Sequence, residues 1–376
     1  MKILIPTADY PPIEGGISTV TVQLARQMVL LGHEVTVVAP FFADMEAFDE
    51  GEPVRVVRYA GYRLGWLRFF PLLFKSWRYM RQCDAVLAIN VAYGGVIGML
   101  ARALRGTPYV VFAYAYEFMK FRRIPFFAWL LRRVYRRAKA VVAISGFTRG
   151  NLVDFGVDSG HIQVILPGAD PDVNVDEAQI EAVRHKFVLD NNRVILSVGR
   201  LIPRKNHIAL VRALPKILER HPETVLLIAG QGPCMWAICQ EARRLGIREQ
   251  LVMPGKVGES DLAALYAACD VFALPAGHDE RGQVEGFGLV FTEAHVHAKP
   301  VVAGNSGGVP EAVIDGETGL LVEPDDPGAI AGAILRILDD AELAWRLGHN
   351  GQKRVEEALN WGTFARGVTH ILEDHS

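Results

Sequence analysis

Cysteine is scarce in this sequence, and long hydrophobic runs are absent from it. The 376 residues include four cysteines, and no two of them form a CxxC pair. They provide no disulfide framework, so we expect a reducing compartment. No stretch reaches 18 uninterrupted apolar residues, the length that a membrane-spanning helix needs, and the run Ile3–Ile5 is too short for a signal-peptide core. We therefore expect a soluble, cytoplasmic chain.

The chain as a whole also lacks an excess of charge of one sign. Its net charge is −2, with 22% charged and 50% apolar residues, a balance typical of a folded enzyme and not of a disordered chain. Residues 1–170 carry 20 Lys or Arg and 13 Asp or Glu, whereas the remainder carries 20 and 29. This asymmetry predicts two domains that meet different partners. No zinc-finger, helix-turn-helix or base-stacking signature accompanies the basic part, so we expect no nucleic acid partner.

Short β-branched runs form two successive series, and the length of the chain exceeds what one hydrophobic core usually organises. The first series comprises seven runs: Lys2–Pro6, Glu34–Ala39, Val54–Tyr59, Ala85–Asn90, Tyr109–Ala113, Ala140–Ser145 and Gln163–Leu166. The second comprises six: Val194–Val198, Thr224–Ala229, Gln250–Met253, Val271–Leu274, Pro300–Ala303 and Gly319–Val322. The runs are almost continuously apolar and alternate with helical stretches, as parallel strands do when helices cover both faces of a sheet.

We therefore predict an α/β fold of two doubly wound, Rossmann-like domains, joined between Pro167 and Asn192. Open sheets of this kind bind ligands beyond the carboxyl ends of their strands. Two such sheets that face each other would form a ligand-binding cleft between the domains.

The first candidate site is the loop after the first strand, which leads into a helix predicted over Val20–Leu31. Gly15 and Gly16 let backbone amides approach an anion closely, and the helix dipole favours negative charge there. The loop is neither a Walker loop nor a GxGxxG fingerprint. Two interpretations remain open: a phosphate contact, or a plain helix start with Ser18 or Thr19 as the N-cap.

The second candidate is the basic segment Gly199–Asn206, which directly follows the predicted strand Val194–Val198. Cations at the carboxyl end of a strand lie where an open sheet binds its ligand. Arg200 offers a planar fork of donors and Lys205 a compact charge, and together they suit a diphosphate. The alternative is a solvated basic loop.

The third candidate is the segment that contains Glu285 and Glu293. The glycines at 286 and 288 indicate that Glu285 lies on a loop, whereas Glu293 lies inside the helix that follows. The amides of Phe287 to Val290 then form an anion-binding helix start. A loop carboxylate, a row of amides and a helix carboxylate together fit a nucleotide-sugar. The alternative, a surface position for Glu293, is disfavoured because its helix is otherwise apolar.

With these residues the chain resembles family 4 of the retaining glycosyltransferases, whose members have the GT-B architecture of two facing Rossmann-like domains. The matching positions span the chain in the order of the family: Gly15-Gly16, Gly199-Arg200 with Lys205, Pro254-Gly255-Lys256-Val257, Ala273-Leu274-Pro275, the Glu285 and Glu293 pair, and Gly307-Gly308-Val309-Pro310-Glu311 followed by Gly316 and Gly319.

The resemblance implies roles for the charged residues. Arg200 and Lys205 would hold the donor diphosphate and balance the charge of the departing nucleotide. Glu285 would contact the donor sugar as a catalytic residue, and Glu293 would bind the donor ribose.

Further donor contacts are implied through the backbone. Three amides lie near the sugar hydroxyls or the phosphate: Phe287, Gly288 and Leu289. Gly15 and Gly16 would close over the phosphates, and Lys256 with Val257 would lie beside the nucleobase.

The resemblance implies no cofactor and no divalent metal, because the two cations take the place of a metal ion at the diphosphate. The nucleoside diphosphate sugar is a co-substrate. Asp170-Pro171-Asp172 superficially matches the metal-binding DxD of the other large glycosyltransferase architecture, but its position at the domain junction argues against that function.

Asp9 and Tyr114 are assigned to positioning of the sugar or the acceptor. Many family members carry histidine in a His-Gly-x-Glu segment, where this chain has Tyr114-Ala115-Tyr116-Glu117. A phenol can donate a hydrogen bond to a sugar hydroxyl, but it titrates far above neutrality and is no neutral-pH proton shuttle. In retaining enzymes of this architecture the departing phosphate is thought to deprotonate the acceptor. His295 and His297 are expected to be packing or surface residues.

Two stretches, residues 63–81 and 122–139, combine aromatic residues with five and seven basic residues, respectively, and contain no acid. If Pro125 opens a helix, one face is suited to the core: Phe127, Leu131, Val134, Tyr135 and Ala138. Rings and cations share the outward arc: Phe126, Trp129, Arg132, Arg133, Arg136 and Arg137. Such a face fits an anionic membrane surface. The alternative is a solvated charged face whose rings residues 63–81 partly cover.

We expect a retaining hexosyltransferase, peripheral at the inner face of the cell membrane, that acts on an amphiphilic acceptor such as a phosphatidylinositol or a polyprenyl-phosphate-linked saccharide. Residues 281–286 and 305–308 look closest to the phosphatidylinositol mannoside mannosyltransferases, which makes GDP-mannose the leading donor. Residues 1–170 would bind the acceptor and residues 171–356 the donor, with a helix over about 357–376 crossing back to the first domain.

Two alternatives remain. One is a family member that uses a UDP-sugar and a soluble acceptor. The other is a nucleotide-sugar-binding protein without transferase activity, with Tyr114 as the sign of a decayed site. A Rossmann dehydrogenase is disfavoured by the missing GxGxxG. The oligomeric state is not predicted.

Overall fold

The computed structural model describes residues 1–114 and 124–374 and divides the chain into two compact units. Unit 1 consists of Met1–Pro167 and the C-terminal segment that begins at Trp361, and unit 2 is Gly168–Asn360. The chain enters unit 2 within the boundary region predicted from the sequence and leaves it a few residues after the predicted position 356.

Unit 1 contains a seven-stranded parallel sheet with the strand order β3-β2-β1-β4-β5-β6-β7. Its strands are β1 (Lys2–Pro6), β2 (Glu34–Pro40), β3 (Arg55–Tyr59), β4 (Ala85–Ala88), β5 (Tyr109–Ala113), β6 (Ala140–Ala143) and β7 (Ile162–Val164). All seven predicted strands are present. β4 and β6 end earlier than predicted because Asn90 and Ser145 use their side chains to cap the helices that follow.

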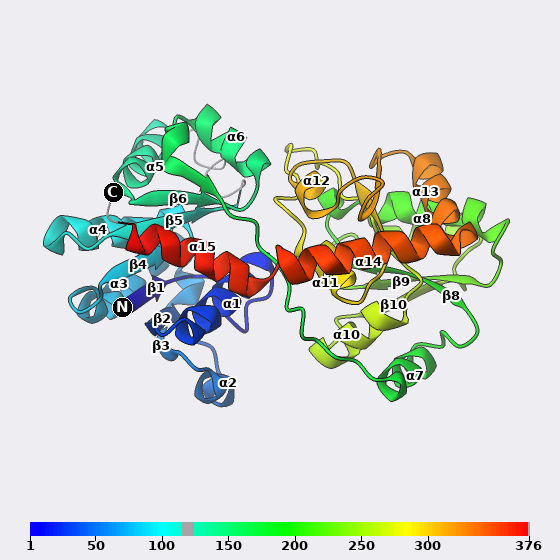
Figure 1. Cartoon of the computed structure of the whole chain (residues 1–376), viewed down its shortest axis with the longest axis horizontal. Coiled ribbons are helices and arrows are strands. Elements are labelled where there is room, and N and C mark those ends of the chain that lie inside the picture. Colours follow the sequence, from blue (N-terminus) through cyan, green and yellow to red (C-terminus); the bar gives the residue numbers. More distant parts are fainter. Residues whose placement is uncertain (115–123, 375–376) are drawn as a thin grey trace. The chain divides into compact units, whose positions relative to one another are not determined.

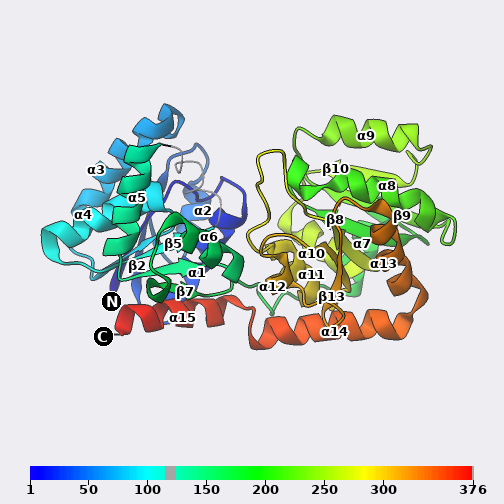
Figure 2. The same cartoon turned by 90° about the horizontal axis from the view of Figure 1, so that it is seen from above.

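Helices cover both faces of this sheet (Figures 1 and 2). They are α1 (Gly16–Leu30), α2 (Glu46–Gly51), η1 (Tyr62–Arg68), α3 (Phe69–Met80), η2 (Val91–Gly95), α4 (Val96–Arg105), α5 (Pro125–Arg137), α6 (Gly146–Phe155), η4 (Ser159–His161) and α15 (Trp361–Glu373). Helices α3, α4 and α5 pack through Leu72, Ile97 and Leu131 on one face. Helices α1 and α15 lie side by side on the other face, where Phe364 contacts Phe112 of β5.

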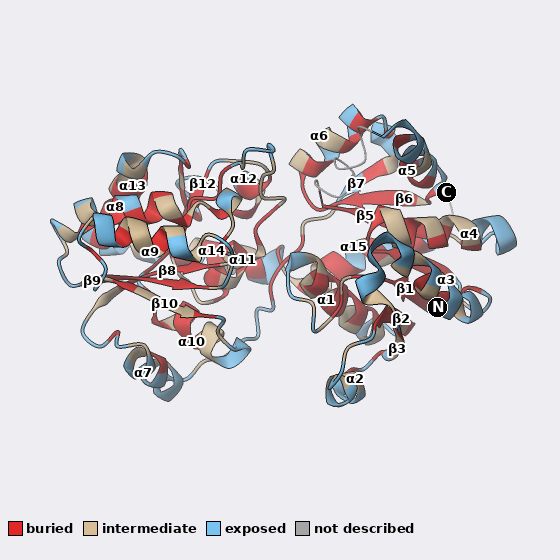
Figure 3. Cartoon of the chain, turned by 180° about the vertical axis from the view of Figure 1, so that it is seen from behind, coloured by how far each residue is buried: buried red, intermediate tan, exposed pale blue. Residues whose placement is uncertain are grey.

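Unit 2 contains a six-stranded parallel sheet with the strand order β10-β9-β8-β11-β12-β13. Its strands are β8 (Arg193–Val198), β9 (Thr224–Ala229), β10 (Leu251–Gly255), β11 (Val271–Leu274), β12 (Val301–Gly304) and β13 (Gly319–Val322). Its helices are α7 (Glu177–Lys186), η5 (Pro203–Lys205), α8 (His207–Leu218), α9 (Met235–Arg244), α10 (Glu259–Ala268), α11 (Leu289–Val296), α12 (Val309–Ala312), α13 (Pro327–Asp339) and α14 (Ala341–Glu357). The central strands of both sheets are buried, whereas the edge strands β3 and β7 and helix α2 are partly or largely exposed (Figure 3).

The two connections between the units are joined inside unit 2. The amide of Ala169 donates to the carbonyl of Leu359 at 2.9 Å, and Ala169 forms an isolated bridge with Asn360. A Cβ atom at Gly168 would lie less than 3.0 Å from the backbone of Leu359. Only glycine therefore permits this close approach of the entering and leaving chain.

We predict that Gly168→Ala lowers the free energy of unfolding by about 1–3 kcal/mol, because the added methyl group meets rigid backbone. Gly332→Ala in α13 is the control, since no atom lies within 4 Å of its Cβ position, and it should be neutral or stabilise by about 0.5–1 kcal/mol. Urea denaturation of both variants measures the difference. Equal stability of the two variants would show that the backbone at Gly168 relaxes freely.

Candidate active site

The loop between β8 and α8 carries the basic residues and is rigidly held in unit 2. Lys205 closes the short 3-10 helix η5, and Leu201 is fully buried with its amide bonded to the carbonyl of Gln231 at 2.9 Å. Asn206 adopts a left-handed conformation and donates through Nδ2 to the carbonyl of Pro324 at 2.7 Å. Gly199, with a φ of 150°, adopts a conformation that favours glycine, and the Lys205 side chain lies beside it. The backbone thus directs Lys205 before any ligand binds.

The carboxylate of Glu285 is bound by two cations of this loop. Its Oε2 lies 2.8 Å from Nζ of Lys205 and also accepts a hydrogen bond from Nη1 of Arg204. Burial alone would raise the pKa of Glu285, but the charges of Lys205 and Arg204 outweigh it and lower that pKa to about 2. Glu285 is therefore ionised throughout the neutral range. The sequence predicted Lys205 and Glu285 but missed Arg204.

Glycines support the loop that presents Glu285. The amide of Gly308 donates to the carbonyl of Glu285 at 2.9 Å. Gly307 has a φ of 57°, and a Cβ atom there would approach the same carbonyl to less than 3.0 Å. At Gly288, with a φ of 95°, a Cβ atom would collide with the ring of Phe291. Gly307 and Gly288 therefore let the loop fold tightly around Glu285.

Glu293 lies inside α11, as predicted, and its Oε2 accepts a hydrogen bond from the hydroxyl of Tyr266 at 2.7 Å. Burial raises the pKa of Glu293, although the hydrogen bond from Tyr266 and the charge of Lys205 act in the opposite direction. The alternative of a surface position for Glu293 is therefore wrong. His295 bonds the carbonyl of Thr318 at 2.8 Å and His297 stacks on Tyr266, so both are packing residues, as expected.

Strand order explains why the cations and Glu285 meet. The order in unit 2 reverses between β8 and β11, and this topological switch point is where an open α/β sheet binds its ligand. Lys205 follows β8 and Glu285 follows β11. Phe287, Gly288 and Leu289 continue from Glu285 into α11, which begins at Leu289.

The remaining candidate residues of unit 2 lie at the same edge of the sheet. Arg200 follows β8 and is exposed, and its side chain has no polar partner among the described residues. Lys256 and Val257 follow β10, two strands away from β8.

Asp170 accepts the amide of Asp172 at 3.0 Å in the connection that enters unit 2. No three His, Cys, Asp or Glu residues of the described ranges are grouped as metal ligands would be.

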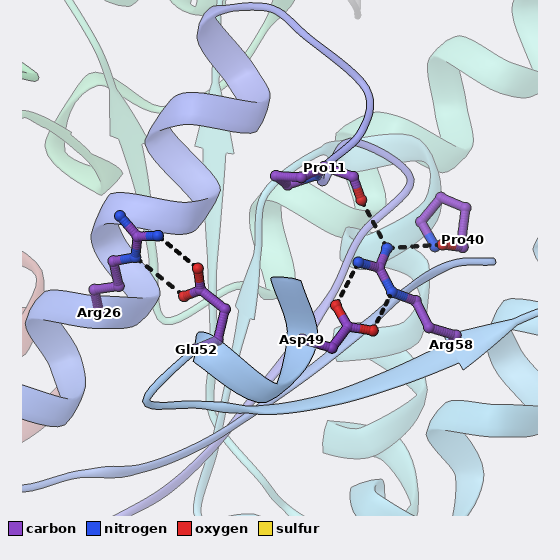
Figure 4. A network of polar contacts seen from close by, with 6 residues as sticks. All are labelled: Pro11, Arg26, Pro40, Asp49, Glu52 and Arg58. Atoms are coloured by element: carbon purple, nitrogen blue, oxygen red, sulfur yellow. Dashed lines mark hydrogen bonds and ion pairs between the residues drawn. The ribbon is translucent and has the colours of Figure 1, made fainter. Parts of the chain in front are cut away.

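In unit 1, the loop that carries Gly15 and Gly16 is held by Arg58 of β3 (Figure 4). Nη1 of Arg58 donates to the carbonyls of Pro11 and Pro40 at 2.8 and 2.9 Å, and Asp49 binds the other side of the guanidinium. A second bidentate pair, Arg26 with Glu52, ties α1 to the segment after α2.

Helix α1 begins at Gly16, four residues before the predicted start. Gly15 is its N-cap, with a φ of 143° and no side-chain cap. The interpretation of Ser18 or Thr19 as the N-cap is therefore wrong, because both lie within the first turn.

The switch point of unit 1 lies between β1 and β4, and it is polar as well. Asp9 follows β1 and receives a hydrogen bond from the side chain of Asn90, which follows β4. Burial raises the pKa of Asp9, although the charge of Arg68 and the bond from Asn90 oppose that rise. The guanidinium of Arg68 lies over the rings of Tyr62 and Tyr93, at 5.1 and 4.8 Å from their centroids. The sequence predicted Asp9 but missed Asn90 and Arg68.

Tyr114 follows β5 and is buried. The remaining residues of its segment, Ala115-Tyr116-Glu117, lie outside the described residues.

Helix α5 begins at Pro125, as predicted, and buries three of the expected core residues, Leu131, Val134 and Tyr135. Phe127 is 41% exposed, so its assignment to the core was wrong; it lies in the first turn, against Phe126.

The outward arc of α5 is exposed, and its aromatic rings are uncovered. Phe126 and Trp129 expose 64% and 55% of their surface. Arg133 lies over the ring of Trp129 at 5.6 Å, and Arg132 donates to the carbonyl of Phe155 at 2.7 Å. None of the described helices combines the length and apolar character needed to cross a bilayer.

Comparisons with known proteins cover the whole chain. Residues 14–173 match the family described as Glycosyltransferase Family 4, and residues 179–354 match Glycosyl transferases group 1. The GDP-mannose-dependent alpha-(1-6)-phosphatidylinositol monomannoside mannosyltransferase of Mycolicibacterium smegmatis is 31% identical over 98% of both chains. An uncharacterized glycosyltransferase of Methanocaldococcus jannaschii is 28% identical over 99% of this chain and 98% of its own.

Solved structures share the fold. HepE of Anabaena in complex with UDP has a TM-score of 0.83 at 23% identity and 99% coverage of both chains. Sucrose-phosphate synthase of Thermosynechococcus elongatus has a TM-score of 0.79 at 23% identity, with 98% of this chain and 97% of that chain covered. Given the full-length relative at 31% identity, the two parallel sheets and the family matches over both units, the chain belongs to glycosyltransferase family 4 and has the GT-B fold.

Proposed function

We propose that this glycosyltransferase moves mannose from GDP-mannose to a membrane-associated glycolipid or lipid-linked saccharide, with retention of the anomeric configuration. The observation that carries the proposal is the meeting of Lys205 and Glu285 at the topological switch point of unit 2. A cation for a diphosphate and a carboxylate for a sugar are what the transfer of a hexose from a nucleoside diphosphate requires.

The donor would lie along the carboxyl edge of the unit 2 sheet. Lys205 and the unpaired, exposed Arg200 bind the diphosphate and stabilise the charge that develops on the departing nucleotide. Glu293 binds the ribose, and the hydrogen bond from Tyr266 fixes its orientation.

Other contacts complete the proposed donor site. Glu285 contacts the sugar through Oε1, which has no partner within the described residues. The backbone donors at the start of α11 contact hydroxyls or phosphate: Phe287, Gly288 and Leu289. Lys256 and Val257 lie beside the base.

GDP-mannose is favoured by the mycobacterial relative, which is named for that donor and aligns over nearly its whole length. The solved structures of HepE contain UDP or UDP-glucose, so a UDP-sugar is the competing donor class. Both donors have a ribose and a diphosphate in common, and they differ in the base and in the identity of the hexose.

The acceptor is proposed to bind unit 1 at its own switch point. Asp9, held by Asn90, offers a carboxyl oxygen to a hydroxyl of the acceptor, and Arg68 offers a guanidinium to an anionic group. Tyr114, which follows the adjacent strand β5, donates a hydrogen bond where the family has histidine.

A membrane surface would deliver such an acceptor. The exposed face of α5 combines two aromatic rings with four arginines: Arg132, Arg133, Arg136 and Arg137. Helix α3 adds further exposed rings, among them Phe70, Phe74 and Trp77. Rings that enter the lipid headgroup region and cations that bind anionic lipids are typical of interfacial helices.

Calorimetric titration with GDP, UDP and ADP tests the donor. We expect GDP to bind at least about tenfold more tightly than UDP, a difference of about 1.4 kcal/mol. Tighter binding of UDP would agree with a glycosyltransferase but would reject GDP-mannose as its donor. Binding of none of the three would reject the proposed donor site.

Glu285→Ala and Lys205→Ala should each reduce sugar transfer at least about a hundredfold, because each removes a charge that acts on the reacting groups. Glu223→Ala is the control, since this exposed glutamate pairs with Arg193 far from the switch point. Release of nucleotide from the donor, with circular dichroism to check folding, is the measurement. Near-normal turnover in either variant would contradict the assigned roles.

Charge reversal of Arg133, Arg136 and Arg137 to Glu should weaken cosedimentation with vesicles of anionic lipid at least about a hundredfold, at about 1 kcal/mol for each residue. Arg132 is left unchanged because it holds Phe155.

The control reverses three exposed cations of unit 2, namely Lys216, Arg243 and Arg346, and changes the net charge equally. If both variants lose binding alike, general charge and not the α5 face explains the attraction. Unchanged binding of the α5 variant would identify a solvated surface.

A further inference from the structure

Arg204 has no part in the donor site described above, yet it binds the central carboxylate of that site. Both Arg204 and Lys205 contact Oε2 of Glu285, and all three side chains are largely buried, with 23%, 10% and 13% of their surface exposed, respectively. Two cations therefore contact this one carboxylate, while the charge of Lys205 also acts on Glu293. Arg204 is thus a second cation at Glu285, in addition to the lysine.

The second cation matters once a diphosphate is present. Lys205 carries a compact ammonium with three donors and lies at the switch point, where the diphosphate is proposed to bind. A lysine that turns toward the diphosphate, whose two phosphate groups each carry one negative charge, loses its contact with Glu285. The carboxylate would then be buried without a cation, a state that costs several kcal/mol or is relieved by protonation.

Arg204 is placed to prevent this outcome. Its backbone carbonyl accepts the amide of Gly277 at 2.9 Å, and Gly277 begins the loop that ends at Glu285. Its guanidinium binds the Glu285 carboxylate at the other end of that loop. Arg204 thus contacts this loop at both ends, near Gly277 through its backbone and at Glu285 through its side chain. Five donors in a planar fork also allow it to keep a carboxylate in one orientation.

We propose that Arg204 is a positioning residue for the transfer step: it keeps Glu285 ionised and in place while Lys205 turns from Glu285 to the donor diphosphate. This inference rests on the proposed function, since it assumes that a nucleoside diphosphate sugar binds at the switch point. Glu285 serves in the empty site as the counterion that the diphosphate later replaces. Arg204 acts through Glu285 and need not touch the substrate.

The pH dependence of kcat in Arg204→Gln tests the proposal. When both Lys205 and Arg204 are present, the pKa of Glu285 is about 2. Glu285 is then fully ionised at neutral pH, so its protonation does not limit kcat. Without Arg204 the pKa of Glu285 rises, and kcat should fall as the pH drops through the raised value. We expect a loss of about tenfold or more at pH 6, a smaller loss at pH 8, and a KM for the donor within about threefold of the original.

Two matched variants accompany Arg204→Gln. Arg204→Lys keeps a cation near Glu285 and should restore most of the activity and the original pH profile. Arg212→Gln, which breaks the ion pair between Arg212 of α8 and Glu241 of α9, should leave kcat unchanged at every pH. If Arg204→Gln loses the same share of kcat at every pH, or if Arg204→Lys does not restore kcat, the positioning function is contradicted. Such a result would indicate that the substitution merely displaces the loop that ends at Glu285.

Binding of a nucleoside diphosphate without sugar separates the two proposals. Glu285→Gln frees Lys205 from its counterion, so GDP, or UDP if that is the preferred nucleotide, should bind about threefold to tenfold more tightly than to the unaltered chain. If Glu285→Gln binds the nucleotide equally or more weakly, the proposed movement of Lys205 from Glu285 to the diphosphate is contradicted, but the proposed donor site is not. If the unaltered chain binds no nucleoside diphosphate, the proposed function and this inference fall together.

Discussion

Parallel pairing of the strands decides where the polar residues of this protein gather. Each strand of a parallel sheet ends at the same edge as its neighbours, so loops far apart in the sequence meet there. In unit 2 this edge brings Lys205 to Glu285 across 80 residues of chain, and in unit 1 it brings Asp9 to Asn90. The strands of both sheets carry mostly apolar side chains, and nearly all of the candidate site residues lie in the loops. Had one strand next to a switch point run antiparallel, its loop would have left the site.

The contact of Glu285 with Arg204 and Lys205 shows how such an edge can hold charge away from water. Removing a carboxylate from water is costly, and the cost is offset only by close cations and by further hydrogen bonds. Here the loop is also held through its backbone, by Gly308 at the carbonyl of Glu285 and by Gly277 at the carbonyl of Arg204. The main chain therefore holds Glu285 and Arg204 in place before a ligand arrives, and in the proposed exchange only Lys205 reorients. Such preorganisation is what electrostatic catalysis requires.

Much of this arrangement can be predicted from the sequence, because it depends on local patterns. Continuous apolar runs identify all thirteen strands found within residues 1–114 and 124–374, and glycines identify the loop that ends at Glu285 and the helix that contains Glu293. What escapes prediction depends on tertiary contacts. Tyr266 meets Glu293 only because α10 packs on α11. Arg204 shares an acceptor with its neighbour Lys205 because the loop after β11 brings Glu285 against both. Phe127 was misassigned because helical periodicity does not reveal where along α5 the core ends.

Helix α15 is part of unit 1, although it follows the whole of unit 2 in the sequence. Its apolar side chains, among them Phe364, Val368 and Ile371, are buried against unit 1, whereas the rest of that unit ends at Pro167. A ribosome therefore makes the first 167 residues, then the whole of unit 2, and only then the helix that closes the first sheet. During that interval the face beside α1 stays open to water, and unit 2 is the first part able to finish folding. The unit that begins the chain is the last to become whole.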